Sequence, residues 1–260
     1  GAKALPARTY YARLTKALIT ALSAQTAAGT LYAVDMRLRP SGRQGPAATP
    51  WTGYQHYQLE EAWTWEHLAL TRARVLAGEA SLGAEVEALR REVIAVKGQG
   101  ARVRADVAEM RGRLQAAKPA LGAWEAKNGP GRIMDIELAA QTVALMAASP
   151  ARGVERQIAA GSGAIVPETD AQGLLSAYRL LWRLHAAARL LSDRVMDWDS
   201  LGEGGSAFIL RDCGAKDADG LRATLTKAVA NVEAAVDRLV GVAGDGETGD
   251  RETGDGTGGS

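Results

Sequence analysis

Apolar residues recur every three or four positions along most of the chain, which is the spacing of one face of an α-helix. The first stripe predicts a helix over residues 8–27, and Gly29 follows its end. An aromatic-rich stripe predicts a second helix from Tyr54 to about Leu76, with Pro50 near its start. Later stripes predict further helices around residues 82–93, 103–114, 136–147, 171–196 and 221–239. The pattern therefore predicts a mainly α protein.

The proline positions support these boundaries. All eight prolines lie outside the predicted helices, at residues 6, 40, 46, 50, 119, 130, 150 and 167. Because a proline inside a helix costs about 3 kcal/mol, their avoidance of these segments agrees with the periodicity.

One segment alternates with a period of two instead. Between residues 31 and 38, apolar side chains occupy every second position, and Asp35 and Arg37 share the other face. This pattern predicts a short strand, a turn over Pro40–Gly45 and a weak return strand over residues 45–49. A carboxylate on a strand that leads into a glycine-rich turn suits a metal–phosphate site. A surface ion pair between Asp35 and Arg37 explains the same spacing.

Composition and charge narrow the class of protein. The 260 residues carry a net charge of +1 without a basic tract, which argues against a nucleic-acid partner. The single Cys213 excludes an internal disulfide and fits a reducing compartment. The longest apolar run, residues 138–148, is too short to cross a bilayer, so we expect no membrane contact and a cytoplasmic location.

The two ends of the sequence differ from the rest. The first residue is Gly1 rather than Met, which indicates part of a longer protein. Residues 244–260 contain no apolar side chain and repeat Glu-Thr-Gly-Asp, so we expect a disordered tail.

Three strings resemble one enzyme family: LYAVDMRLRPSG from Leu31, EAWTWEHLALTRARV from Glu61, and GPGRIMDIELAAQ from Gly129. They are similar to the adenylyltransferase half of bifunctional glutamine synthetase adenylyltransferase/adenylyl-removing enzymes, and the likeness extends from about residue 9 to 243. It implies a fold that is mainly α. Residues 1–80 would be the C-terminal piece of a nucleotidyltransferase α/β palm with one or two strands, and residues 81–243 a helical bundle domain.

The resemblance also implies a site. Asp35 matches the third metal-binding carboxylate of the family and would be catalytic, while Arg37 and Arg39 would face phosphates. Alternatively, either arginine pairs with a carboxylate such as Glu66. The family's other two carboxylates come from a Gly-Ser-Asp-x-Asp turn that does not occur here, so we expect this chain alone to have an incomplete active site and negligible turnover.

A second part of the site is implied by the segment before and within the helix predicted near residue 136. Lys127, Gly131, Asp135 and Glu137 match the family residues that face the nucleotide, although helix capping alone explains the two acidic residues. Two departures are Arg132, where the family has a second glycine, and Leu138, where it has phenylalanine. The charge of Arg132 would still suit a phosphate.

The remaining candidates are weaker. Trp63 and Trp65 cannot share one helix face at a spacing of two, and we expect them to serve packing rather than a cleft. Arg72 and Arg74 are candidate phosphate contacts. His185 lies on an apolar stripe and is expected to be a hydrogen-bonded core residue.

By resemblance, the function is transfer of AMP from ATP, with Mg²⁺, to a tyrosine of glutamine synthetase. The PII signal protein and glutamine would control it. Two alternatives stay open: a relative of the uridylyltransferases that modify PII, and a helical module that docks glutamine synthetase or PII without catalysis.

Overall fold

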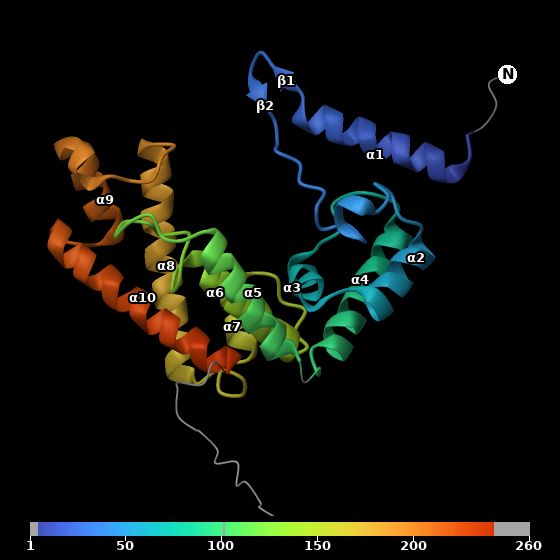
Figure 1. Ribbon diagram of the computed structural model, residues 1–260. Helices are drawn as coiled ribbons and strands as arrows, with labels where there is room; N and C mark the ends of the chain where they lie inside the picture. Colours follow the sequence, from blue (N-terminus) through green and yellow to red (C-terminus); the bar gives the residue numbers. More distant parts are fainter. Residues whose placement is uncertain (1–4, 101, 242–260) are drawn as a thin grey trace, which may run out of the picture.

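The computed structural model describes residues 5–100 and 102–241, and this part of the chain is mainly helical, as the sequence predicts (Figure 1). The predicted tail over residues 244–260 lies outside the described residues. The α-helices are α1 (Ala7–Ser23), α2 (Trp51–His56), α3 (Thr64–Arg72), α4 (Ala80–Lys97), α5 (Val103–Ala117), α6 (Ile133–Met146), α7 (Val154–Ala160), α8 (Glu168–Leu191), α9 (Gly202–Cys213) and α10 (Ala218–Val240). None of them is long and apolar enough to cross a membrane.

The strand predicted over residues 31–38 is wrong. A small antiparallel hairpin, β1 (Gln25–Thr26) with β2 (Gly29–Thr30), precedes this segment, which has no regular structure of its own. Alternation alone does not make a strand, because a strand also needs a neighbour to pair its backbone groups. In the described part, the predicted return strand over 45–49 is absent too, and a 3₁₀ turn, η1 (Gly42–Gln44), closes the loop instead.

The single helix predicted from Tyr54 to Leu76 is divided. After α2 comes a π-helical turn, η2 (Tyr57–Glu61), and the backbone is then extended at Ala62 and Trp63 before α3 begins. Neither glycine nor proline marks this break in the sequence. The apolar pattern did not predict α7 or α9. Helix α7 has only seven residues, and α9 begins with Gly-Glu-Gly-Gly, which carries no apolar stripe.

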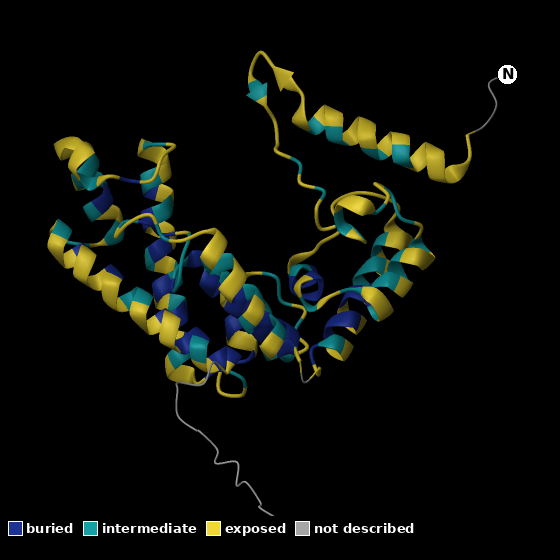
Figure 2. Cartoon of the chain, in the orientation of Figure 1, coloured by how far each residue is buried: buried dark blue, intermediate teal, exposed yellow. Residues whose placement is uncertain are grey.

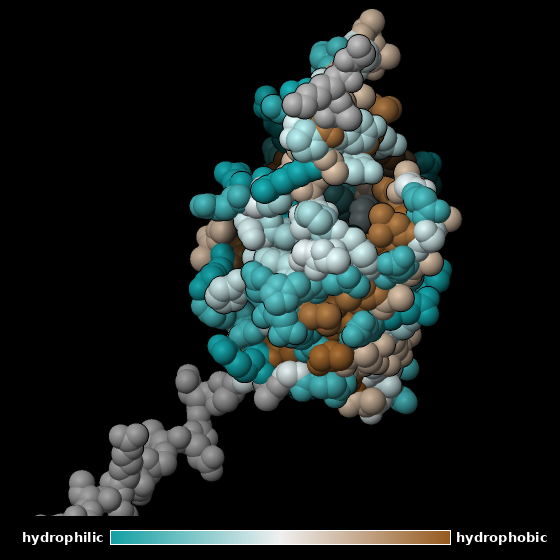
Figure 3. All heavy atoms as spheres, turned by 90° about the vertical axis from the view of Figure 1, so that its right-hand side faces the viewer, coloured by the Kyte–Doolittle hydropathy of each residue, from teal (hydrophilic) through white to brown (hydrophobic). Residues whose placement is uncertain are grey.

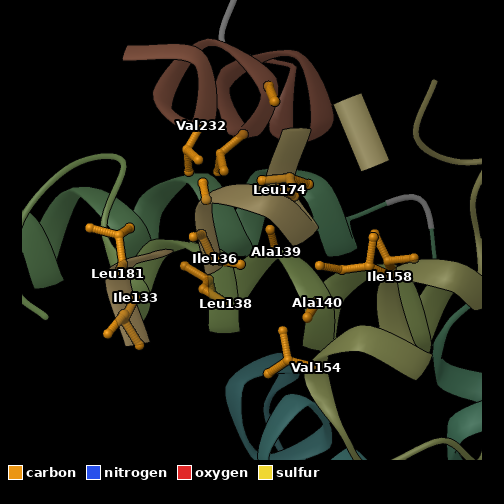
Figure 4. Packing of buried hydrophobic residues seen from close by; sticks show 14 of the residues in the cluster. Ile133, Ile136, Leu138, Ala139, Ala140, Val154, Ile158, Leu174, Leu181 and Val232 are labelled. Carbon is orange, nitrogen blue, oxygen red and sulfur yellow. The ribbon is translucent and has the colours of Figure 1, made fainter. Parts of the chain in front are cut away.

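Helix α6 is the centre of the molecule. Ten of its 14 residues are buried, and it contacts α3, α4, α5, α7, α8 and α10. Figure 4 shows Ile136 and Ala139 of α6 among Val154 and Ile158 of α7, Leu174 and Leu181 of α8, and Val232 of α10. A helix that is apolar on nearly all sides is stable only when other helices surround it, which explains the bundle.

The N-terminal region is packed more loosely than the bundle. A small apolar cluster of Leu70, Leu89 and Val93 holds α2, α3 and α4 together. By contrast, α1 has no buried residue, and its Leu14 and Leu18 are 50% and 58% exposed (Figure 2). Figure 3 shows several apolar side chains at the surface on this side of the molecule.

Candidate functional site

Asp35 and Arg37, the predicted centre of the site, form an exposed ion pair. Nη2 of Arg37 lies 2.6 Å from Oδ2 of Asp35, and the Nε and backbone N–H groups of Arg37 also donate to this carboxylate. The two side chains are 67% and 56% exposed. The hydrogen bonds from Arg37 lower the pKa of Asp35, so its carboxylate is ionised at neutral pH. The surface ion pair considered from the sequence is therefore present.

Arg39 does not project beside Asp35, contrary to the prediction from spacing. Its guanidinium donates to three backbone carbonyls, those of Met36 at 2.6 Å and of Arg43 and Gly45 at 3.1 Å. These bonds close the turn that follows the irregular segment. The observed role of Arg39 is to shape this turn, because its five N–H groups suit a cluster of carbonyl acceptors.

Magnesium prefers oxygen ligands, and a single carboxylate holds it only together with water and other donors. Asp35 supplies one such carboxylate. Within residues 5–100 and 102–241, no three His, Cys, Asp or Glu side chains form a group that could hold a metal ion. Within the described residues, Asp35 therefore belongs to no such group.

Glu66 is not a partner of either predicted phosphate-facing arginine. Its buried carboxylate accepts the Tyr57 hydroxyl at 2.8 and 2.9 Å and the Trp63 backbone N–H at 3.1 Å. Burial and the nearby Glu66 carboxylate raise the pKa of Tyr57. This phenol therefore stays protonated at neutral pH and donates a hydrogen bond to Glu66. The arrangement joins η2 to the first turn of α3 and accounts for the helix break between them.

The two tryptophans of this region are at the surface, so the expectation that both serve packing is wrong. Trp63 is 69% exposed and Trp65 is 40% exposed. They line a groove of about 330 Å³ between α3 and α5, which also presents Arg102, Asp106 and Arg113. Because aromatic side chains are enriched at protein interfaces, this groove is a candidate contact surface.

Arg72 connects the two predicted parts of the site. Its Nη1 lies 3.2 Å from Oε2 of Glu137, which joins α3 to α6. Arg72 also lines a groove of about 280 Å³ together with Leu38 and Glu66. The segment around residue 38 therefore meets α3, and α3 meets Glu137. Asp35 itself does not line this groove.

Asp135 is buried and holds the turn before α6. Its carboxylate accepts Nε and Nη2 of Arg111 at 2.7 and 2.8 Å and the backbone N–H of Gly131 at 2.9 Å. Asp237 of α10 also pairs with Arg111. Burial alone would lower the pKa of Arg111, but its bonds to the two aspartates outweigh that effect and raise it. Asp135 thus has a structural role: Oδ2 accepts from the turn before α6, and both oxygens accept from Arg111.

Gly131 and Arg132 are set by this turn. Gly131 has a φ of +70°, and a Cβ added there would lie 2.2 Å from the carbonyl oxygen of Val229 in α10. Arg132 has a φ of −105°, so it replaces the expected glycine without backbone strain. Its guanidinium donates to the carbonyls of Glu125 at 2.6 Å and Pro130 at 3.0 Å, which is why it braces the loop instead of facing a phosphate.

Lys127 lies in the same loop, where its backbone N–H donates to a Glu125 carboxylate oxygen at 2.8 Å. Its side chain lines a pocket that His185 of α8 also lines. His185 is half-buried and contacts Trp182 edge-on, so it is not the core histidine expected from the sequence. Cys213 is half-buried, and burial raises its pKa to about 11, which makes its thiolate scarce.

Arg111 was missed as a site-shaping residue, although the sequence contains a signal for it. It follows Val107 by four positions and precedes Leu114 by three, so it falls on the apolar stripe of its helix. The fully buried Arg90 occupies the same kind of position between Val86 and Val93 and donates to the backbone carbonyls of Thr71 in α3 and of Pro150. A charged residue inside an apolar stripe predicts a buried partner.

Two family models match different parts of this chain. The glutamate-ammonia ligase adenylyltransferase family model matches residues 1–89, and the GlnD PII-uridylyltransferase family model matches residues 101–241. The second match covers the helical bundle around α6.

Similar proteins share one description, bifunctional glutamine synthetase adenylyltransferase/adenylyl-removing enzyme. The protein of Brucella suis is 36% identical over 249 residues, which is 94% of this chain and 25% of the relative. That of Rhizobium meliloti is 54% identical over 59% of this chain and 15% of the relative. That of Xanthobacter autotrophicus is 43% identical over 74% of this chain and 20% of the relative. The chain thus spans a quarter or less of the length of these relatives. It belongs to the family of bifunctional glutamine synthetase adenylyltransferase/adenylyl-removing enzymes.

Proposed function

We propose that the chain is the carboxy-terminal portion of the transferring half of such an enzyme, which moves AMP from ATP to a tyrosine hydroxyl of glutamine synthetase. Residues 1–80 complete a nucleotidyltransferase palm, and residues 81–243 form the helical domain beside it. PII and glutamine regulate the whole protein, which acts in the cytoplasm.

One observation carries this proposal: Asp35 keeps an exposed, ionised carboxylate on a segment without regular structure, and the only hydrogen bonds to it come from Arg37 in the described part of the chain. By contrast, Asp135 is buried and accepts three hydrogen bonds that fix it in the fold. The exposed carboxylate is free to exchange its arginine for a metal ion, because exposed ion pairs contribute little free energy.

The residues of this chain then have distinct tasks. Asp35 supplies one metal ligand, and Arg37, released from it, faces the phosphates of the nucleotide. Lys127 and Glu137 lie on the helical side of the site, while Gly131 and Asp135 fix the turn that presents them. Bound magnesium ions would align the reacting phosphate and neutralise its charge. Two further carboxylates, from a Gly-Ser-Asp-x-Asp turn, complete the metal site in the longer protein, so the present chain alone transfers AMP negligibly.

The test uses a longer protein in which such a turn precedes this sequence in frame. Purified glutamine synthetase, PII and Mg-ATP are supplied, and the mass of each acceptor is measured. We expect AMP on glutamine synthetase, its loss in Asp35→Asn, and unchanged transfer in Asp199→Asn, a matched exposed carboxylate on η3 (Trp198–Ser200). A nucleotide on PII instead would favour the uridylyltransferase relative. Equal transfer by both variants would reject Asp35 as a ligand.

A second candidate function is docking without catalysis, which the exposed Trp63 and Trp65 favour. Large aromatic side chains at a groove are typical anchors of protein interfaces. If this is the function, Trp63→Ala with Trp65→Ala should weaken the complex with glutamine synthetase at least about tenfold. Trp182→Ala, which removes a comparably exposed tryptophan from α8, is the control. Tight binding by the longer protein without AMP transfer would establish the docking function.

A further inference from the structure

A pocket of about 320 Å³ lies between the loop that precedes α6 and the C-terminal end of α8. The loop contributes Lys127, and the end of α8 with the segment after it contributes His185, Arg189 and Arg194. Neither Asp35 nor Arg37 lines this pocket. Three permanent cations and a histidine from two separate segments therefore converge on one hollow of ligand-binding size.

The two carboxylates at this pocket offset only part of the charge of its three cations. Glu125 is 8% exposed, and its carboxylate accepts the backbone N–H groups of Lys127 and Asn128 at 2.8 and 3.1 Å, so it is committed to the loop. The side chain of Asp193 is 98% exposed and lies 3.3 Å from Arg189. In the part of the chain that the structure describes, no carboxylate forms an ion pair with Lys127 or Arg194. The pocket keeps an excess of positive charge.

His185 also lines the pocket, and the nearby cations affect its pKa. Its ring is half-buried against Trp182, with a distance of 5.8 Å between ring centroids. Burial and the charges of Lys127 and Arg189 lower the pKa of His185, and the smaller influence of Glu125 opposes them. Cations on the loop and on α8 are thus both close enough to act on one imidazole, which places them around a common space.

We propose that this pocket binds a phosphate group, held by Lys127, Arg189 and Arg194 with His185 as a further hydrogen-bond donor. Guanidinium and ammonium groups form charge-assisted hydrogen bonds with phosphate oxygens, and several such donors at once give specificity for a dianion. The inference rests on the proposed function at one residue, because Lys127 lies at the nucleotide site in that proposal, and it adds Arg189, Arg194 and His185. Phosphate binding here requires neither Asp35 nor an acceptor protein.

The experiment measures binding of inorganic phosphate to the full chain by calorimetry, without nucleotide. We expect saturable binding that weakens at least about tenfold when Arg189→Gln and Arg194→Gln are combined. Arg91→Gln on α4 removes an exposed arginine of similar charge and should change nothing. The absence of saturable binding, or equal affinity in all variants, would overturn the proposal. Failure of AMP transfer would not affect this result.

Two further measurements show where the phosphate binds and which kind of molecule carries it. Phosphate bound near the ring should raise the pKa of His185, because its negative charge opposes the effects of Lys127 and Arg189. An NMR titration of the imidazole measures this pKa. If phosphate leaves it unchanged, the anion binds elsewhere and the pocket is rejected. Competition with Mg-ATP then identifies the source. If ATP displaces phosphate, and the same variants weaken this displacement, the pocket binds a nucleotide. If ATP does not displace phosphate, the pocket binds free phosphate or a phosphate ester. Either competition result supports a phosphate site.

Discussion

Two arginine–aspartate pairs in this chain have the same chemistry and opposite surroundings. Arg37 and Asp35 are two residues apart and largely exposed, whereas Arg111 and Asp135 are 24 residues apart with side chains 7% and 4% exposed. The first pair links two residues of the same short segment and contacts no other element through its ion pair. The second joins α5 to the turn before α6 and, through Asp237, to α10.

The difference teaches how to separate a residue that supports the fold from one available for chemistry. A buried charge must keep its partner, because water cannot replace it, and so its role is fixed. An exposed charge exchanges its partner at little cost, so it can bind a ligand. By this criterion Asp135 supports the fold, and Asp35 is the residue to examine for function.

The largest expected effect comes from breaking the buried pair. Arg111→Met leaves the buried Asp135 carboxylate without a counter-charge, which should lower the free energy of unfolding by about 3–5 kcal/mol. Urea denaturation measures it. Adding Asp135→Asn removes the uncompensated charge while it keeps an acceptor for Gly131, so the double variant should recover part of the loss. A loss no greater than that of Arg37→Met would contradict the comparison.

The next effect tests the turn that the buried pair supports. Gly131→Ala combines a left-handed backbone with a Cβ 2.2 Å from a carbonyl oxygen of α10, and it should cost about 2–4 kcal/mol. Gly214 is a close control, because its φ of +69° is nearly the same and nothing lies within 4 Å of its Cβ position. Gly214→Ala should therefore cost only about 1 kcal/mol in the same urea experiment. Equal losses would mean that contact with α10 does not matter.

Much of the bundle could be predicted from the sequence, because apolar stripes and proline positions report burial directly. The extended segment could not, since Asp35 alternates correctly with its neighbours but no strand pairs with it in the described chain. The helix break at Trp63 depends on a carboxylate three residues later, Glu66, and on Tyr57 of the preceding turn. Arg111 lies 24 residues from Asp135 in the sequence, so only the folded chain identifies this pair.

A smaller effect concerns pH. His67 is buried in α3, where its Nε2 lies 3.1 Å from the Gln58 carbonyl oxygen, and burial lowers its pKa below the ordinary value of 6.5. Between these two pKa values the unfolded chain binds more protons than the native one, so stability should fall as the pH drops below 6.5. Urea midpoints measured from pH 7.5 downward test it. His67→Gln should flatten this part of the profile, and an unchanged slope would assign the dependence to another group.

The smallest effect is expected at the exposed pair, and its smallness is what makes it informative. Asp35→Asn and Arg37→Gln should each leave the urea midpoint nearly unchanged, because water replaces the lost partner. Urea denaturation of the two single variants and the double variant measures the coupling between them. A loss comparable to that of Arg111→Met would mean that this segment is anchored, and Asp35 would then belong with Asp135 as a structural residue. With the fold unaffected, loss of AMP transfer by Asp35→Asn in the longer protein can be assigned to the carboxylate itself.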